Sequence, residues 1–155
     1  MKKEDMKLTG LIEIILRGAD GKVKETREVK NLIVTTGKAA VAGLMLADIG
    51  GTAFDYIAIG TGTDAAAAGN TALQTEITTN GGQRTTGTGT RVTTSVTDDT
   101  AQLVASWTFT GSFAVTEAGI LNAASDGTLL ARQVFSAINV VSGDSLQITW
   151  KVQVS

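Results

Sequence analysis

The stretch Leu146–Val154 reads LQITWKVQV and alternates apolar with polar side chains from its first residue to its last. A period of two is typical of a half-buried β-strand. Successive side chains of a strand point to opposite faces, so the five apolar groups share one face. Each of them stabilises the fold by roughly 1.5 to 3 kcal/mol when it is buried. The stretch therefore predicts a sheet with an apolar face, and the rest of the chain has to supply the neighbouring strands.

The second half of the chain continues the β pattern. Strands are predicted at 91–97 and 101–110, and in a hairpin that joins 118–123 with 128–135. Turn residues separate the strands at 98–100, 125–127 and 142–144. The alternation of the first two strands points seven side chains inward, namely Val92, Thr94, Val96, Leu103, Ala105, Trp107 and Phe109. Short strands at regular spacing predict a mainly β fold, either an antiparallel β-sandwich or a small barrel.

One short α-helix is predicted from Gly37 to Asp48, because apolar residues recur there at intervals of three and four. Thr35 or Thr36 is the expected N-cap of this helix, and Gly50-Gly51 is expected to end it. The sequence also allows a short helical turn over Asn70–Ile77.

Residues 8–34 predict two strands joined by a turn, in which the Asp-Gly pair at 20–21 suits a three-residue loop. That loop pairs residue i with residue 40 minus i, which places Glu13 opposite Arg27. A two-residue loop would place Glu13 opposite Glu28, and like charges facing each other destabilise a strand pair. We therefore expect the three-residue loop and its register.

The N-terminal hairpin needs a surface to dock on, because a free two-stranded ribbon is marginal in water. Its first strand is apolar on one face, whereas its second strand is charged. Docking on its own body and docking on a neighbouring subunit are both open. We hypothesise that residues 1–31 are a β-hairpin arm that reaches a neighbouring subunit or the capsid, beside a body over residues 32–155. The expected partner contacts of this arm are Leu8, Ile12, Ile14, Leu16, Lys24 and Arg27.

Composition limits the chemistry of the protein. Its 155 residues are the size of one domain and can bury a core without covalent staples. The chain has no cysteine and no histidine, which excludes disulfides, thiol catalysis and the usual zinc or copper ligands. Any metal would have to be a hard, oxygen-bound ion, and we expect no cofactor. A formal net charge of −2 and a pI near 5.1 argue against a nucleic-acid surface, which needs clustered Lys and Arg.

Charge is concentrated at the N-terminal end of the chain. Residues 1–31 hold 14 of the 28 charged side chains, and the other 124 residues share the remaining 14. That is about 11% of the later residues, against about 25% in ordinary domains. Such a surface is either simply rich in threonine or largely covered by partner subunits, since interface cores are depleted in charge. We expect the second, and therefore a homo-oligomer.

The chain shows no targeting segment. Its first seven residues mix lysines with acids, and Glu13 interrupts the apolar run that follows, so a secretory signal is not expected. The longest apolar stretch, 39–47, is far shorter than the roughly 20 residues that span a bilayer. We expect a soluble protein that is made in a cytoplasm and has no membrane partner.

A nucleotide site and a serine nucleophile are both disfavoured. Gly60–Ala65 fits GxGxxA after a predicted strand at 54–59, but the βαβ unit that a dinucleotide site requires is missing. The glycines are better explained by a tight turn that lets the chain leave the sheet. No serine lies in a GxSxG or SxxK motif, and no histidine is present to act as its base.

Paired carboxylates and the tryptophans are also better explained by structure. The candidate carboxylates all lie in predicted turns, where Asp bonds its own backbone, and they are Asp98, Asp99, Asp126 and Asp144. Trp107 and Trp150 could stack on a sugar, but both fall on the apolar side of a strand, so core packing is expected. We expect no catalytic residues.

Five stretches share a pattern with a known group of proteins. They are Phe54–Thr63 (FDYIAIGTGT), Ala72-Leu73, Glu76-Ile77, Thr116–Asn122 (TEAGILN) and Gly127–Arg132 (GTLLAR). With these stretches the chain resembles small virion structural proteins of tailed bacteriophages. It is most similar to capsid decoration proteins, which stabilise the head, and related stretches occur in tail-fibre and tail-collar proteins. The resemblance extends over residues 29–154 and leaves residues 1–28 aside.

The resemblance implies a β-tulip-like domain that forms a homotrimer and carries no catalytic residues. It further implies a virion protein that binds the major capsid protein on the outer surface of the capsid and clamps neighbouring capsomers. Such a protein is synthesised in the cytoplasm of the bacterial host. The alternative is a tail-fibre or tail-collar component, and a soluble carbohydrate-binding module or an enzyme comes last.

Overall fold

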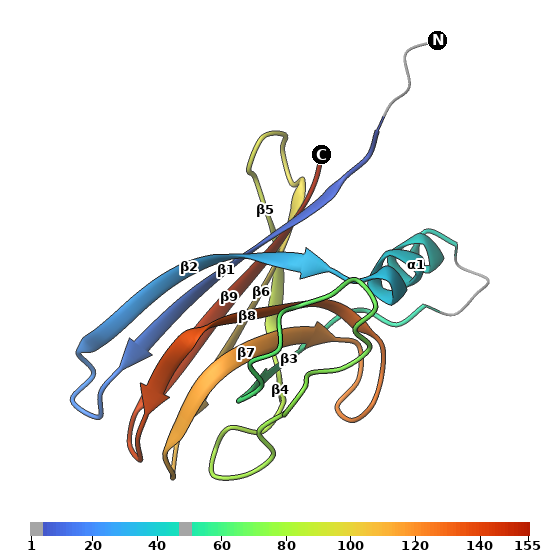
Figure 1. Cartoon of the computed structure of the whole chain (residues 1–155). Coiled ribbons are helices and arrows are strands. Elements are labelled where there is room, and N and C mark those ends of the chain that lie inside the picture. Colours follow the sequence, from blue (N-terminus) through green and yellow to red (C-terminus); the bar gives the residue numbers. More distant parts are fainter. Residues whose placement is uncertain (1–4, 47–50) are drawn as a thin grey trace.

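The computed structural model describes residues 5–46 and 51–155, and its strands form one antiparallel sheet (Figure 1). The strands are β1 (Leu8–Arg17), β2 (Val23–Ile33), β3 (Tyr56–Gly60), β4 (Thr85–Thr86), β5 (Thr88–Val92), β6 (Thr100–Thr108), β7 (Phe113–Leu121), β8 (Leu129–Val140) and β9 (Ser145–Val154). Helix α1 (Thr35–Leu44) lies between β2 and β3 in the chain. The order of the strands across the sheet is β4-β3-β7-β8-β2-β1-β9-β6-β5.

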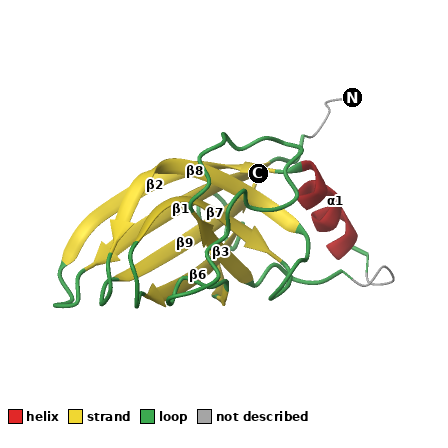
Figure 2. Cartoon of the chain, turned by 60° about the horizontal axis from the view of Figure 1, so that its bottom comes forward, coloured by secondary structure: helices red, strands yellow, loops and turns green. Residues whose placement is uncertain are grey.

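The sheet curves until its two edges almost meet (Figures 1 and 2). Its edge strands, β4 and β5, are separated in the chain by Gly87 alone. The backbone N–H of Gly87 donates to the carbonyl of Asp55, next to β3, at 2.8 Å. Closure of this kind removes most of the unpaired edge of a sheet. Over the residues that the structure describes, the predicted mainly β fold with one short helix is confirmed, in the form of a nearly closed barrel.

The stretch that decides the fold forms β9, which lies between β1 and β6. Leu146, Ile148 and Trp150 have no exposed surface, and Val152 is buried as well. Val154, at the end of the strand, is 44% exposed. The predicted alternation is therefore confirmed, with its last apolar group outside the core.

The core fills the inside of the barrel. Leu103, Ala105, Trp107 and Phe109 of β6 and its end point inward as predicted. A smaller apolar cluster lies on the outer face of the sheet, where Leu73 of the loop 61–76 covers side chains that alternate with the core residues of the strands. The cluster consists of Val34, Ala58, Leu73, Leu121 and Leu129.

The N-terminal hairpin is an integral part of the barrel. β1 pairs with β9 along its whole length and with β2 on its other side. Ile12, Ile14 and Leu16 are at most 3% exposed. Over the described residues 5–31 the expected arm is therefore wrong, and docking on its own body is the arrangement observed. The apolar face of β1 is buried in the interior of the same chain, so it needs no neighbour.

The predicted turns are present. Gly21 has a φ of 79°, and the N–H of Gly18 donates to the carbonyl of Lys22 at 2.9 Å, as a three-residue loop requires. The turns after β7 and β8 use the left-handed region at Asp126, Gly127 and Gly143.

The register predicted for the hairpin is wrong over most of its length. A β-bulge next to the turn shifts the pairing by one residue, so Glu13 faces Glu28 and not Arg27. The repulsion between the two carboxylates is offset by Lys151 of β9, whose Nζ lies 2.7 Å from Oε1 of Glu13.

Helix α1 begins without the predicted side-chain cap. Val34 is its N-cap, and neither Thr35 nor Thr36 makes a capping hydrogen bond. The N–H of Val34 donates to the carbonyl of Leu130 at 3.0 Å, and Thr36 Oγ1 donates to the carbonyl of Leu129 at 3.4 Å. The chain passes directly from β2, paired with β8, into the helix, so it leaves no free residue for a cap.

Three further sequence predictions have other outcomes. The expected end of the helix, at Asp48 and Gly50, lies outside the described residues, and the described helix ends at Leu44. Asn70–Ile77 forms bends and an isolated bridge at Glu76, and no helix. The strand predicted at 91–97 is wrong beyond Val92, because the residues that follow turn back around Asp99.

Candidate functional site

Two opposite charges are completely buried on neighbouring strands. Glu117 of β7 and Arg132 of β8 have side chains that are 0% and 2% exposed. Arg132 Nη2 lies 2.7 Å from Glu117 Oε2, and Arg132 Nε donates to the same oxygen at 2.8 Å. Buried charges persist only where they are paired and hydrogen-bonded. This pair is therefore the strongest polar feature of the described chain and the natural candidate for a functional site.

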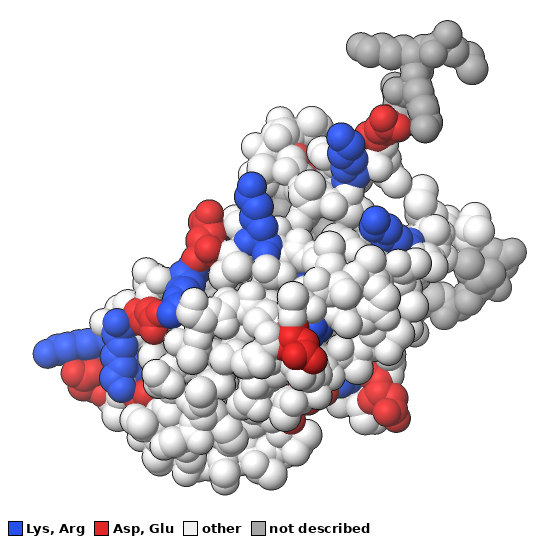
Figure 3. Space-filling model, viewed as in Figure 1, with Lys and Arg blue, Asp and Glu red and all other residues white. Residues whose placement is uncertain are grey.

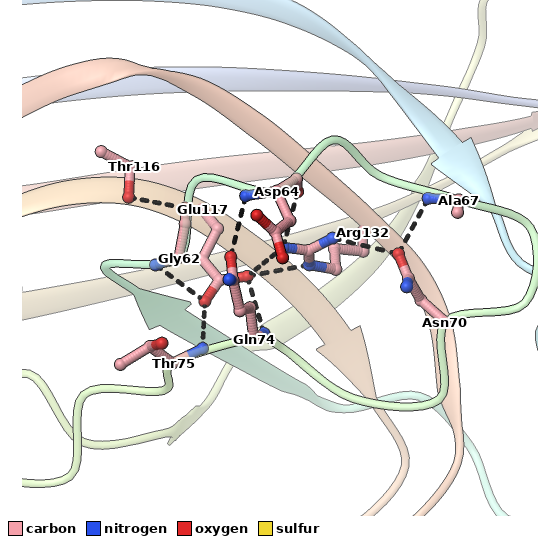
Figure 4. Close-up of polar contacts among 9 residues, drawn as sticks. All are labelled: Gly62, Asp64, Ala67, Asn70, Gln74, Thr75, Thr116, Glu117 and Arg132. Carbon is pink, nitrogen blue, oxygen red and sulfur yellow. Dashed lines mark hydrogen bonds and ion pairs between the residues drawn. The ribbon is translucent and has the colours of Figure 1, made fainter.

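The carboxylate of Glu117 holds the loop 61–76 (Figure 4). Oε1 accepts the backbone N–H groups of Gly62 at 3.1 Å and Thr75 at 2.7 Å, and Oε2 accepts that of Gln74 at 3.0 Å. A Cβ on Gly62 would lie 2.5 Å from Oε1, so only glycine allows this approach. The loop is thus fixed at both of its ends by a single side chain.

Arg132 fixes the middle of the same loop (Figure 4). Its Nη1 donates to Oδ1 of Asn70 at 3.0 Å, and its Nη2 donates to the carbonyl of Asp64 at 3.1 Å. Asn70 Oδ1 also accepts the N–H of Ala67 at 2.8 Å. We call Glu117, Arg132 and the loop groups that they bind the clasp. Both charged groups of the clasp bind protein atoms throughout, which makes it a fastening between the loop and the sheet.

The clasp explains the two glycines of the GxGxxA stretch at 60–65, because a Cβ on Gly60 or on Gly62 would lie 2.5 Å from Oε1 of Glu117. In a dinucleotide site, backbone N–H groups of such a stretch face a phosphate. Here the N–H of Gly62 faces the carboxylate of Glu117, and the chain continues into a loop instead of a helix. The predicted tight turn is wrong: residues 61–63 continue from β3 without a turn, the N–H of Thr61 donates to the carbonyl of Thr75 at 2.9 Å, and the chain bends only at Asp64.

The four candidate carboxylates organise turns or bind within the chain. The N–H of Val96, together with those of Thr94 and Ser95 and the amide of Gln153, holds the pKa of Asp99 well below its usual range. Asp98 and Asp126 occupy left-handed turn positions.

Asp144 joins the β8–β9 turn to the N-terminal hairpin. Burial acts to raise the pKa of Asp144, but the ammonium of Lys24 and the N–H of Val141 outweigh it, so the pKa lies below its usual value. Lys24 Nζ is 2.7 Å from Asp144 Oδ1, and the N–H of Val141 donates to Oδ2 at 3.0 Å. The tryptophans belong to the core as predicted, with Trp107 3% and Trp150 0% exposed.

The structure does not gather the six expected arm contacts into one surface. Ile12, Ile14 and Leu16 lie in the core, and Leu8 packs half-buried at its edge. Lys24 binds Asp144, as above. Arg27 donates to the carbonyl of Ser136 and pairs with Glu25.

The clasp was missed from the sequence, although a signal was present. Between Thr100 and Gly143 only Glu117, Asp126 and Arg132 are charged, and two of these lie within apolar strand patterns on either side of a predicted turn. Isolated opposite charges in the two strands of a hairpin indicate a buried pair. The predicted hairpin began at Ala118, one residue too late to include Glu117.

The described residues lack two further kinds of feature. They contain no group of three or more acidic side chains placed to hold a metal ion. No helix within residues 5–46 and 51–155 is long and apolar enough to cross a membrane.

No protein-family model, curated protein or solved structure matches the chain. The five stretches singled out in the sequence can be located in the fold. They form β3, the middle and end of β7, the start of β8 and parts of the loop 61–76. Glu117 and Arg132 belong to two of these stretches, and Gly62 to a third. The clasp therefore connects three of these five stretches.

Proposed function

We propose that this protein is a structural subunit of a tailed-bacteriophage virion that binds the outer surface of the capsid and clamps neighbouring capsomers. The observation that carries the proposal is the position of the resembling stretches, which the clasp joins into one rigid unit. Their polar residues bind the protein's own backbone. Motif residues used in this way support a role as a scaffold and not as a catalyst.

The distribution of charge supports assembly with other subunits. In Figure 3 the charged side chains gather along the β1–β2 hairpin, and most of the remaining face is free of them. Depletion of charge is typical of the centres of protein interfaces. We propose that three copies assemble and that the assembly contacts the major capsid protein through charge-poor surface. A position in the tail fibre or tail collar is the second candidate, on the same resemblance.

Reconstitution tests the proposal. Phage particles are prepared from a genome that carries this coding sequence and from the same genome with the sequence deleted. Purified protein should co-sediment with the deleted heads until it saturates, and should raise the temperature at which they release their DNA. An unrelated β-barrel protein of similar mass is the control and should stay in the supernatant. Binding to isolated tails and not to heads would contradict the capsid proposal, and binding to neither would contradict both candidates.

A further inference from the structure

Exposed apolar side chains gather at one end of the barrel. Figures 1 and 2 place helix α1, the start of β1 and the end of β9 toward the same end. Of the eight large apolar side chains that are exposed in the described chain, five belong to these segments. We call the surface that they form the α1 face, and its exposed side chains are Met6, Leu44, Met45, Leu46 and Val154. A contiguous apolar surface of this kind marks an interaction site.

The α1 face has hollows as well as projections. One hollow, of about 530 Å³, lies in the gap between β5 and the residues that precede β3, and Leu44 and Val154 are among its lining residues. A second, of about 420 Å³, is lined by Met6 and Met45. Both hollows are lined by Leu8 and Val41, so they are neighbours. Met45, which is 69% exposed, projects beside them.

Charges of both signs border these hollows. Lys7 and Lys38 line the smaller hollow, and Asp55 lines the larger one. None of these three side chains has an ion-pair partner within the part of the chain that the structure describes. The face thus offers an apolar centre with unpaired positive and negative groups around it.

We infer that the α1 face is where a second copy of this chain docks. In an assembly of three copies each chain meets two neighbours, one through each side of the contact, so a face near the three-fold axis has to supply both sides. This face does so, because it carries projections together with hollows, and positive groups together with a negative one. A small apolar ligand would use the hollows but leave the projecting methionines and the charges without partners. The inference rests on the self-association in the proposed function, to which it assigns a surface.

Sedimentation of single variants tests the inference. At micromolar concentration the wild-type protein should sediment with a mass above the 16.0 kDa of one chain. Met45→Lys should weaken self-association by tenfold or more, because it places a charge at an apolar contact already bordered by lysines. Val96→Lys is the matched control, since Val96 is also 69% exposed but lies in the turn between β5 and β6. It should assemble as the wild type does. Self-association itself raises the melting temperature, so thermal unfolding is followed by circular dichroism at a concentration at which all three proteins are single chains. There the three melting temperatures should agree.

Each other result overturns the inference. A wild-type protein that sediments only as single chains excludes docking of a second copy. Self-association that Met45→Lys leaves intact, or that Val96→Lys weakens equally, places the contact elsewhere. Native mass spectrometry that finds a small apolar molecule bound to single chains identifies a different occupant. Capsid binding is scored separately with the deleted heads, so an assembled protein that fails to bind them contradicts the proposed function and not this inference.

Discussion

Among the charged residues, substitution of Glu117 should destabilise the fold most, because it breaks the buried ion pair with Arg132. Glu117→Gln leaves the guanidinium of Arg132 buried without a counter-ion, and breaking a buried pair in this way costs about 3 to 5 kcal/mol. Urea unfolding should show this loss of free energy of unfolding. Glu13→Gln is the control, because its pair with Lys151 is partly exposed, and such pairs contribute about 0 to 1 kcal/mol. Equal losses in the two variants would mean that the clasp does not stabilise the fold.

Trp150 tests the register of β9. The side chain has no exposed surface, so Trp150→Ala should lower the free energy of unfolding by about 3 to 5 kcal/mol. Lys151 points to the other face of the same strand, and Lys151→Ala should have little effect. An equal fall in melting temperature for both variants would show that the strand does not alternate as described.

Asp144 should make the protein sensitive to acid. Its pKa is lowered in the folded state, so the unfolded chain takes up a proton first as the pH falls below about 3.9. The stabilisation by Asp144 is therefore present at neutral pH and is lost in that acidic range. Melting temperatures measured from pH 7 to pH 2 should fall less steeply for Asp144→Asn and for Lys24→Met than for the wild type. An unchanged slope in both variants would remove Asp144 as a cause of acid unfolding.

Among the elements, β1 has a role opposite to the one that the sequence suggests. Because β1 lies between β2 and β9, deletion of residues 1–28 exposes the edge of β9 and removes Ile12, Ile14 and Leu16 from the core. We expect the truncated protein to be unfolded, with its β-type circular dichroism lost. A folded truncated protein would restore the hypothesis of an independent arm.

A strand or turn could be predicted where the residues that determine it are neighbours in the sequence. The alternation within β9 and the turns at Gly21, Gly127 and Gly143 follow from neighbouring residues, and the structure contains them. The bulge next to the first turn could not be predicted from neighbouring residues. The same part of β2 supplies Lys24, whose partner Asp144 lies 120 residues further along the chain. Whether the hairpin docks on its own body or on a neighbouring subunit likewise depends on β9, which lies outside the two-strand pattern of residues 8–34.

The candidate site is the part that sequence patterns describe least well. The glycines at 60–65 suggest a tight turn, but the path of the chain there depends on Glu117, more than 50 residues away, which binds the N–H of Gly62. The strand pattern at 91–97 is locally sound, yet the three N–H groups that bind Asp99 favour a turn there. In both places a side-chain carboxylate accepts hydrogen bonds from backbone N–H groups that the local sequence pattern would place in a helix or a strand.

At the scale of the whole molecule, the barrel has a buried core and a surface whose charge and polarity differ from one end to the other. Charge lies along the hairpin, the clasp fastens a long loop to the outer face, and the apolar α1 face lies at one end. Such a molecule is suited to fixed contacts with several neighbours at once. We therefore expect it to act as a rigid structural piece on the virion.

Cryo-electron microscopy of the phage particle encoded together with this chain tests that claim most directly. We expect density for the nine-stranded barrel on the outside of the head, at positions where neighbouring capsomers meet, with the α1 faces of adjacent copies in contact. A particle whose head lacks this density, or in which the barrel occurs only in the tail, would contradict a role in capsid stabilisation.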